Sequence, residues 1–239
     1  MHIIYKNLPL FISPNLYKTF QIEGEEFYHA IKVLRIKKGD FIKITNGTGN
    51  MVIARITEIG KNSFYFEITE EIETKPLSYK LHLAVAPTKN IDRYDFMVEK
   101  CTEIGFSELT PIICEQSERK TVKIDRLQRI VNAAVKQSLK AQIPIINEPE
   151  NFEKFVKKYA LFQNKYLSLC TEIEKTAIME IVNNVKDAIV TVGPEGDFSE
   201  REINFALQNG FKPVSLGTSR LRTETAGITV CNAFYLMNN

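Results

Sequence analysis

The apolar residues between Lys32 and Glu70 occur in short segments in which apolar and polar positions alternate. These segments are F-I-K-I-T, M-V-I-A-R-I and F-Y-F-E-I-T, and N-G-T-G-N and I-G-K-N separate them. Such spacing predicts a small antiparallel sheet or barrel in this part of the chain. Asn46-Gly47 and Thr48-Gly49 supply positions that adopt positive φ, so we interpret N-G-T-G-N as a hairpin turn and not as a phosphate-binding loop.

Beyond a charged, proline-containing stretch at residues 70–80, the pattern changes to apolar strands that alternate with helices. The predicted strands are residues 81–86, 109–113, 166–170, 188–193 and 213–217, and the predicted helices are residues 93–105, 125–141, 200–209 and 224–237. Nearly continuous apolar strands between helices indicate an α/β domain with a mostly parallel sheet. We therefore place the domain boundary near residue 74, between a small β domain (1–73) and an α/β domain (74–239).

Length and composition fit a globular chain of two domains. The chain has 239 residues, of which 44% are apolar and 25% are charged. Its longest uncharged stretch, Thr225 to Asn239, has 15 residues and contains Thr, Asn and Gly, so it is too short and too polar to cross a bilayer. The N-terminus, M-H-I-I-Y-K-N-L-P-L, lacks the regions of a secretion signal, which predicts a cytoplasmic protein.

The cysteines and histidines are not spaced like metal ligands. Four cysteines stand far apart in apolar surroundings and form no C-x-x-C pair: Cys101, Cys114, Cys170 and Cys231. We expect them to be reduced core residues. Three histidines share no ligand spacing: His2, His29 and His82. We therefore expect no metal site.

Basic residues are concentrated in one window although the formal net charge is only +2. Residues 117–140 hold seven basic and two acidic residues. In the predicted helix at 125–141, apolar residues fall on one face, and Arg126, Arg129, Lys136 and Lys140 form a basic strip on the other. This strip is either an ordinary solvated face or, together with Arg119, Lys120 and Lys123, an electropositive patch for nucleic acid.

Three predicted strands end in unusual loops. The loops are T-E at residues 171–172, G-P-E-G-D at residues 193–197 and G-T-S-R-L-R-T-E-T-A at residues 217–226. Because open α/β sheets bind ligands at the carboxyl ends of their strands, these loops are candidates for a binding site. For G-P-E-G-D alone, a turn with a helix-capping role for Asp197 or Ser199 is the alternative. The nucleotide motifs G-x-x-x-x-G-K-[ST] and G-x-G-x-x-G and the hydrolase motif G-x-S-x-G do not occur.

Several of these segments, in this order, resemble the RsmE family, the 16S ribosomal RNA uridine-1498 N3-methyltransferases of the SPOUT superfamily. The segments are E-K-C-T-E-I-G (99–105), V-G-P-E-G-D-F-S-x-x-E (192–202) and L-G-x-x-R-L-R-T-E-T-A (216–226). The N-terminal segments H-A-I-K-V-L-R-I-K-K-G-D (29–40) and N-G-T-G (46–49) are similar to the PUA-like RNA-binding domain of that family. The resemblance covers nearly the whole chain.

The resemblance implies a fold, a cofactor and a homodimer. The fold is a SPOUT methyltransferase domain (74–239), an α/β domain with a trefoil knot, preceded by a PUA-like RNA-binding β-barrel domain (1–73). The cofactor is S-adenosyl-L-methionine in the knotted pocket, and the last helix packs against a second subunit. The implied cofactor contacts are Leu169, Thr171, Gly193, Gly196, Leu216, Gly217, Leu221 and Thr223. Thr223 or Thr225 can instead cap the last helix, with Glu224 as a favourable first-turn charge.

The implied reaction is an attack of uracil N3 on the sulfonium methyl group. Arg222 is the first candidate to stabilise the developing uridinate, and holding a phosphate is its alternative role. Glu195 or Glu224 can accept the proton. The candidate RNA-binding residues are His29, Arg35, Lys37, Arg119, Lys120, Arg126, Arg129, Lys136 and Lys140.

The sequence departs from the family pattern at a few positions. Lys136 and Lys140 replace Glu and Arg of A-x-E-Q-S-x-R, Asp197 replaces a frequent glycine, and Thr218-Ser219-Arg220 replaces P-R-I. The expected partners are 16S ribosomal RNA or the 30S subunit and a second copy of the chain, without a membrane or a metal. Two alternatives stay open: an RNA-binding assembly factor without catalysis, and a SPOUT methyltransferase that acts at another RNA position.

Overall fold

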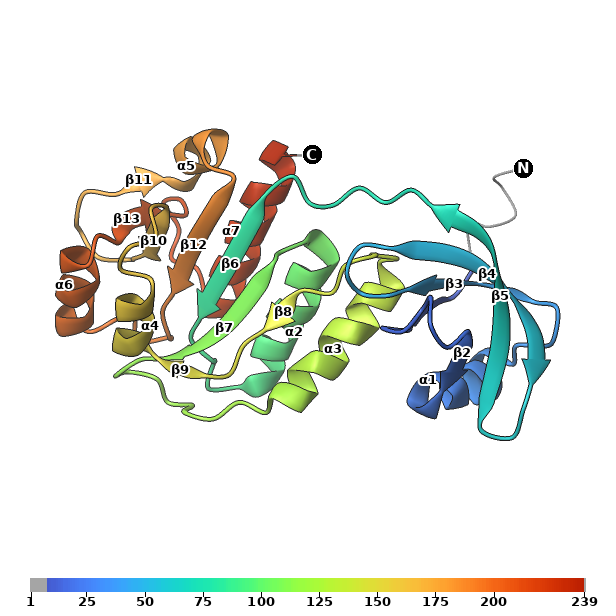
Figure 1. Cartoon of the computed structure of the whole chain (residues 1–239). Helices are drawn as coiled ribbons and strands as arrows, with labels where there is room; N and C mark the ends of the chain where they lie inside the picture. Colours follow the sequence, from blue (N-terminus) through green and yellow to red (C-terminus); the bar gives the residue numbers. More distant parts are fainter. Residues whose placement is uncertain (1–7, 239) are drawn as a thin grey trace. The chain divides into compact units, whose positions relative to one another are not determined.

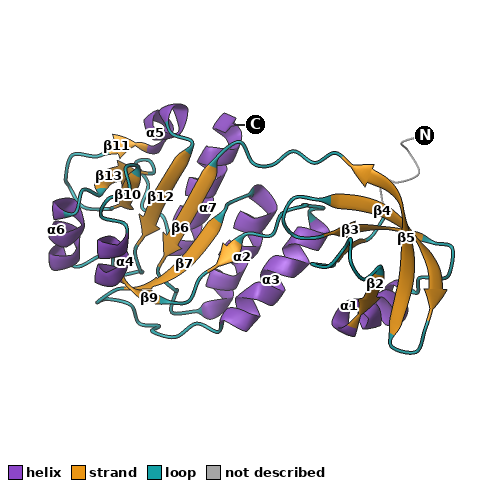
Figure 2. Cartoon of the chain, viewed as in Figure 1, coloured by secondary structure: helices purple, strands orange, loops and turns teal. Residues whose placement is uncertain are grey.

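The computed structural model describes residues 8–238, which divide into two compact units. Unit 1 comprises the residues up to Pro76 together with Val135–Ile143. Unit 2 comprises Leu77–Ala134 together with the residues from Pro144 onward. Figures 1 and 2 show the elements of each unit.

Unit 1 is built on a five-stranded sheet with the order β1-β3-β4-β5-β2. Its strands are β1 (Leu10–Ile12), β2 (Gln21–Glu23), β3 (Phe41–Thr45), β4 (Met51–Ile59) and β5 (Ser63–Ile72). β1 pairs with β3 in parallel, and the other neighbours are antiparallel. The three predicted segments are β3, β4 and β5. N-G-T-G-N is the β3–β4 turn, in which Gly47 and Gly49 have φ angles of 78° and 110°, so its prediction as a hairpin turn is confirmed.

Residues 24–34 of unit 1 are helical, which the sequence pattern did not predict. α1 (Gly24–Tyr28) leads directly into the π-helical segment η1 (His29–Leu34), and Arg35 follows with a left-handed φ of 55°. Our expectation of β structure from Lys32 onward is therefore wrong, since the sheet resumes only at Phe41. Phe27 and Ala30 of these helices are buried in the hydrophobic core of unit 1.

The segment Val135–Ile143 belongs to unit 1 because it holds the β3–β4 turn. Thr45 Oγ1 donates to the carbonyl of Ala141 at 2.6 Å, and the N–H of Gly49 donates to the same carbonyl at 3.1 Å. The N–H of Ile143 donates to the carbonyl of Gly47 at 2.9 Å. These bonds fix the tip of the hairpin to a segment almost a hundred residues away in the chain.

Unit 2 contains an eight-stranded sheet with the order β11-β13-β10-β12-β6-β7-β8, in which β9 also pairs with β7. Its strands are β6 (Lys80–Val85), β7 (Glu108–Ile113), β8 (Ile145–Ile146), β9 (Glu150–Asn151), β10 (Lys165–Ser168), β11 (Thr176–Ala177), β12 (Asp187–Val192) and β13 (Lys212–Ser215). Every pairing is parallel, which confirms the predicted α/β domain.

The helices that begin in unit 2 cover both faces of its sheet (Figure 1). They are α2 (Ile91–Ile104), α3 (Ile124–Gln137), α4 (Phe152–Lys158), α5 (Ile178–Asn184), α6 (Glu200–Gln208) and α7 (Thr223–Asn238). Ala84 of β6 shares a hydrophobic cluster with Phe155 of α4 and Ala206 of α6. The next residue, Val85, lies 3.9 Å from where a Cβ at Gly227 of α7 would be. Because successive strand residues point to opposite faces, α4 and α6 cover one face and α7 the other.

The helix predicted at 125–141 is shorter than expected. α3 ends at Gln137, because Leu139 adopts a left-handed conformation with φ of 54°. The sequence pattern did not predict α4, α5 or the two-residue strands β8, β9 and β11. Within residues 8–238 no helix has both the length and the apolar character of a membrane span.

Candidate functional site

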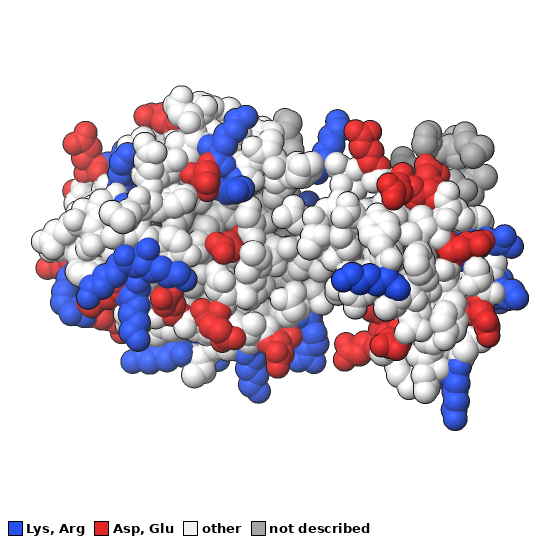
Figure 3. Space-filling model, in the orientation of Figure 1, with Lys and Arg blue, Asp and Glu red and all other residues white. Residues whose placement is uncertain are grey.

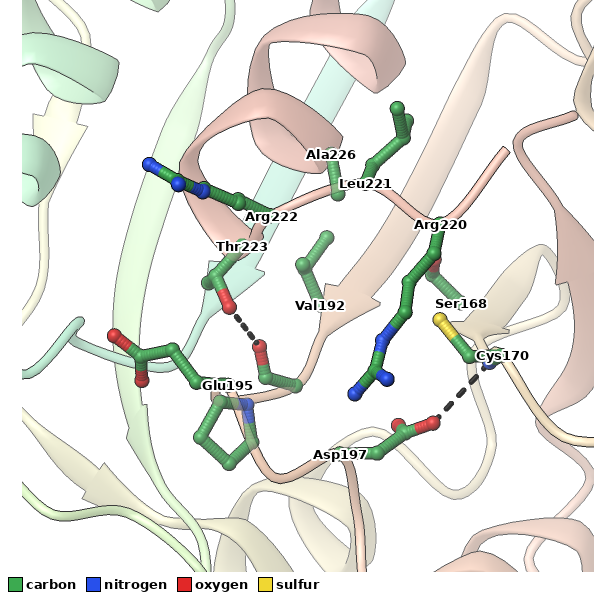
Figure 4. A pocket seen from close by; sticks show the side chains of 12 residues that line it. Ser168, Cys170, Val192, Glu195, Asp197, Arg220, Leu221, Arg222, Thr223 and Ala226 are labelled. Carbon is green, nitrogen blue, oxygen red and sulfur yellow. Dashed lines mark hydrogen bonds between the residues drawn. The ribbon is translucent and has the colours of Figure 1, made fainter.

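Three loops of unit 2 meet at the carboxyl edge of its sheet. β10 pairs in parallel with both β12 and β13, so the carboxyl ends of these strands lie side by side. The cavity between the loops is lined by Ser168, Cys170, residues 192–195, Asp197, residues 220–223 and Ala226 (Figure 4). Ligands of open α/β sheets bind at this edge, so the cavity is the candidate active site.

The predicted cofactor and catalytic residues fall in or beside this cavity. Five of them line it: Gly193, Glu195, Leu221, Arg222 and Thr223. Five others lie on the same three loops but do not line the cavity: Leu169, Thr171, Gly196, Leu216 and Gly217. Glu224 is buried and does not line the cavity; its carboxylate lies 3.9 Å from Nε of Arg93 on α2.

Thr223 joins the start of α7 to the loop after β12. Its buried hydroxyl donates to the carbonyl of Gly193 at 3.0 Å. Both Thr223 and Thr225 lie inside α7, so our alternative that one of them caps this helix is wrong. A Cβ at Gly193 would lie 3.0 Å from the ring of Phe198, so the loop after β12 packs closely at this point.

Asp197 joins the loop after β12 to the loop after β10. Its carboxylate accepts the N–H of Cys170 at 3.2 Å and the N–H of Phe198 at 2.9 Å. The backbone of Asp197 is left-handed, with φ of 64°.

One of the four cysteines differs from the prediction. Cys170 is exposed, so our expectation of a core cysteine is wrong at this position, whereas Cys101, Cys114 and Cys231 are buried as predicted.

The capping interpretation of the G-P-E-G-D segment is confirmed for Ser199. Its side chain caps α6 by accepting the N–H of Glu202 at 3.2 Å, and Glu202 accepts the N–H of Ser199 at 3.0 Å. Glu202 is buried and also accepts the N–H of Glu115 at 2.9 Å. This segment thus provides both a helix cap and one wall of the cavity.

Glu195 and Arg119 both hold the loop between β6 and α2. Glu195 Oε1 accepts the N–H of Lys89 at 2.9 Å. Arg119 donates from Nε to the carbonyl of Thr88 at 3.1 Å and from Nη2 to the carbonyl of Lys89 at 2.8 Å. The guanidinium of Arg119, which we predicted to bind RNA, is therefore engaged with the protein backbone.

The predicted basic strip of α3 is partly neutralised. Arg126 pairs with Asp95 and Asp92 of α2, the latter at 3.2 Å. Lys136 pairs with Glu26 of α1 at 2.6 Å. Figure 3 likewise shows basic and acidic side chains interspersed on the visible face of unit 2. Arg129, whose Nε donates to the carbonyl of Asp125 at 3.3 Å, is exposed.

The candidate RNA-binding residues of unit 1 are exposed beside η1. His29, Arg35 and Lys37 are all exposed, as are Lys32 and Lys38. Residues 28–38 contain four basic residues and no acidic residue. Tyr28 and Val33 are exposed on the same helical segment, with 57% and 65% of their surface accessible. Sequence reasoning missed these two because the helix itself was not predicted.

Arg220 also lines the cavity, although our sequence analysis assigned it no role. Figure 4 shows its side chain extending into the cavity toward Asp197, whereas Arg222 extends in the opposite direction, on the side of Glu195. The signal was present, because Arg220 and Asp197 are two of the positions at which the chain departs from the pattern it resembles. Among residues 8–238, no group of His, Cys, Asp or Glu is arranged to hold a metal ion.

Comparison with known proteins covers both units. The chain matches a family model described as RNA methyltransferase domain over residues 73–235 and one described as RNA methyltransferase PUA domain over residues 22–69. It is 31% identical to ribosomal RNA small subunit methyltransferase E of Rickettsia conorii, over 92% of this chain and 91% of the relative.

Two solved structures resemble the whole chain. A probable rRNA-methyltransferase from Porphyromonas gingivalis is 35% identical, with a TM-score of 0.88 and coverage of 97% of this chain and 98% of that one. A ribosomal RNA small subunit methyltransferase E from Neisseria gonorrhoeae, solved bound to S-adenosyl methionine, is 26% identical, with a TM-score of 0.85 and coverage of 96% and 98%.

Proposed function

Because the chain belongs to the ribosomal RNA small subunit methyltransferase E family of RNA methyltransferases, we propose that it methylates N3 of one uridine, of the uridine-1498 type, in 16S ribosomal RNA. The methyl donor is S-adenosylmethionine. The observation that carries the proposal is the cavity at which the loops after β10, β12 and β13 meet. The loops after β12 and β13 contain residues of the segments that resemble the family.

The cavity fits this cofactor in its small residues and polar groups. A Cβ at Gly193 would contact the ring of Phe198 tightly, at 3.0 Å, and glycine at this position leaves backbone groups to face a ligand. Thr171 Oγ1 is buried without a hydrogen-bond partner among residues 8–238. We propose that the cofactor is held by Leu169, Thr171, Gly193, Gly196, Leu216, Gly217, Leu221 and Thr223. When bound, S-adenosylmethionine supplies a methyl group activated by its sulfonium.

The chain must also deal with the proton on uracil N3. N3 is a weak acid that loses its proton at or before methyl transfer, and a nearby cation favours the resulting anion. Arg222 lines the cavity and pairs with no carboxylate among residues 8–238, so we propose that it stabilises the uridinate. Glu195 uses one carboxylate oxygen to accept the N–H of Lys89, and the other oxygen is not used in this bond. We propose Glu195 as the proton acceptor, because Glu224 does not line the cavity.

Further parts of the proposal concern RNA and assembly. His29, Arg35 and Lys37 of unit 1 are exposed, and we propose that they bind the RNA backbone. The proposed substrate is 16S ribosomal RNA, free or within the 30S subunit, and the proposed location of the protein is the cytoplasm. A homodimer is supported by the exposed apolar residues Leu236 and Met237 of α7. The trefoil knot is part of the proposal through the family to which the chain belongs.

The test is to locate the transferred methyl group. The protein is incubated with labelled S-adenosylmethionine and either 30S subunits or free 16S ribosomal RNA that lack this modification. Digestion and mass spectrometry of the nucleosides should yield 3-methyluridine from one position. Cofactor binding without RNA methylation would favour an assembly factor, and a methyl group on ribose would assign the chain to another reaction.

A further inference from the structure

Four charged side chains line the cavity, and its two carboxylates are already engaged. Glu195 accepts the N–H of Lys89 at 2.9 Å. Asp197 accepts the N–H of Cys170 at 3.2 Å with one oxygen and that of Phe198 at 2.9 Å with the other. The acidic side chains of the cavity thus hold loops together through backbone groups.

The two arginines of the cavity are not engaged in this way. Among residues 8–238, neither Arg220 nor Arg222 has a carboxylate within ion-pair distance or a hydrogen bond from its side chain. Arg220 extends toward Asp197 without pairing with it, and Arg222 extends to the opposite side (Figure 4). A guanidinium that lines a cavity without a partner is suited to bind an anionic ligand group, and its fork matches a carboxylate.

Two separate cations facing two directions indicate two separate anions. S-adenosylmethionine carries one carboxylate, on its methionine part, and the RNA substrate supplies the other negative charge. We propose that Arg220 binds the carboxylate of the cofactor, which leaves Arg222 for the nucleotide. This assignment rests on the proposed function, since it takes the cavity as the cofactor site.

The placement of Arg220 favours the cofactor over the RNA as its ligand. Arg220 extends toward the loops after β10 and β12, which the proposed function assigns to the cofactor, whereas Arg222 lies at the start of α7 on the other side. Asp197 lies across the cavity from Arg220, but among residues 8–238 no ion pair joins the two, and the Asp197 carboxylate accepts the N–H groups of Cys170 and Phe198. Both residues occupy positions at which this chain departs from the family pattern, so we assign this carboxylate contact to this chain and not to the family in general.

The experiment compares ligands with and without the carboxylate. S-adenosylhomocysteine has the amino-acid group, and 5′-methylthioadenosine has the same nucleoside and sulfur but lacks it. Calorimetric affinities of the full chain for both ligands are measured for the wild type, Arg220→Ala and Arg220→Lys. We expect Arg220→Ala to weaken S-adenosylhomocysteine about tenfold and to leave 5′-methylthioadenosine within about twofold. The affinity of Arg220→Lys for S-adenosylhomocysteine should fall between those of the wild type and Arg220→Ala, because lysine keeps the charge but lacks the planar guanidinium that can bond both carboxylate oxygens.

Matched variants separate the possible failures. Lys186→Ala, which removes a cation at the amino end of β12, should bind both ligands like the wild type. An equal loss for both ligands in Arg220→Ala would overturn the proposal in favour of a structural role. Unchanged binding of S-adenosylhomocysteine with weakened RNA binding would make Arg220 an RNA contact instead. A wild type that binds neither ligand would overturn the proposed cofactor site itself.

Discussion

Arg222 combines two features that single it out for the reacting base: it lines the cavity and its charge is not neutralised by the described residues. We expect Arg222→Ala to lower kcat about 100-fold, the usual effect of removing one group that stabilises a developing anion. The affinity for S-adenosylmethionine should change less than about twofold, because the contact forms with the nucleotide. Single-turnover methylation assays and calorimetry measure the two quantities.

Lys186→Ala serves as the charge control for this prediction, since Lys186 lies at the opposite end of β12 from the cavity. If Arg222→Ala raises KM for RNA and leaves kcat unchanged, Arg222 holds a phosphate and does not act on the uridinate.

His82 is the buried histidine of unit 2 and makes stability depend on pH. Its Nδ1 lies 3.1 Å from Glu108 Oε2 and its Nε2 lies 2.8 Å from Thr110 Oγ1, so a neutral ring that donates to Glu108 satisfies both nitrogens. Burial, together with the charge of Lys158, outweighs the partly exposed Glu108 and lowers the pKa of His82 from 6.5 to about 4. The folded state thus keeps this ring neutral at pH values at which the unfolded chain is protonated.

The sign of the pH effect follows from this lowered pKa. Between about pH 6.5 and pH 4 the unfolded state binds more protons, so the free energy of unfolding falls as the pH falls through this range. The expected loss between pH 7.5 and pH 5 is about 2 kcal/mol. Urea unfolding at several pH values should give this loss for the wild type and a flatter profile for His82→Gln, which shares all other titrating groups. Parallel profiles would contradict the lowered pKa.

At single residues, sequence patterns identified the site better than they identified individual roles. The segments at 193–197 and 217–226 predicted the cavity, because glycines and strand ends are visible in a sequence. The role of Thr223 was not visible, since its hydroxyl bonds to Gly193 thirty residues away and not to its own helix. The backbone contacts of Arg119 were not visible for the same reason: its charge is apparent in the sequence, but its carbonyl partners at Thr88 and Lys89 are not.

At the scale of elements, an ion pair between α3 and α1 engages one lysine of the basic strip. Lys136 Nζ lies 2.6 Å from Glu26 Oε1, and each side chain is only 23% exposed. The second oxygen of Glu26 is buried without a partner among residues 8–238. Removing the lysine would leave a largely buried carboxylate without its counter-charge, which costs more than a surface ion pair contributes.

We therefore expect Lys136→Met to lower the free energy of unfolding by about 2 kcal/mol. Lys136→Met combined with Glu26→Gln should recover part of this loss, because the uncompensated charge is removed. Urea unfolding of the two single variants and the double variant gives the coupling. Additive effects in this cycle, or a loss of RNA affinity without a loss of stability, would return Lys136 to the RNA surface.

The elements that the sequence predicted are those with clear periodicity or long apolar runs. Four of the six residues of β6 and of β12 are apolar, and α6 begins with a capping box, so each was recognisable. The π-helical segment η1 has no comparable signal, and two-residue strands such as β8 exist only because a neighbouring strand pairs with them. Tertiary pairing, which a local pattern does not contain, decided these elements.

At the scale of the molecule, the division into units is not a single cut in the chain. Residues 135–143 follow more than fifty residues of unit 2 and yet belong to unit 1, where Ala141 and Ile143 hold the β3–β4 turn. Composition shows the change of pattern near residue 74, but it does not show that the chain returns to unit 1 at residues 135–143. Only contacts such as that from Thr45 to Ala141 reveal it.

The net charge of +2 is too small for a general attraction to RNA, so binding must depend on local groups of basic residues. In unit 1 such a group surrounds η1, where residues 28–38 carry four basic residues and no acidic one. Each phosphate contact that is lost reduces the slope of log affinity against log salt by about 0.7 for single-stranded RNA. Arg35→Gln with Lys37→Gln should therefore reduce the slope by about 1.4 and weaken binding most at low salt.

Fluorescence anisotropy with a 16S ribosomal RNA fragment at several salt concentrations measures this slope for the whole chain. Lys61→Gln is the matched control, because Lys61 is an exposed lysine of the same unit in the turn between β4 and β5. Its slope should equal that of the wild type, since a lysine outside the binding surface releases no counterions. Equal slopes for all three proteins would exclude Arg35 and Lys37 from the RNA interface. The same reduction in Lys61→Gln would mean that the chain attracts RNA through its overall charge.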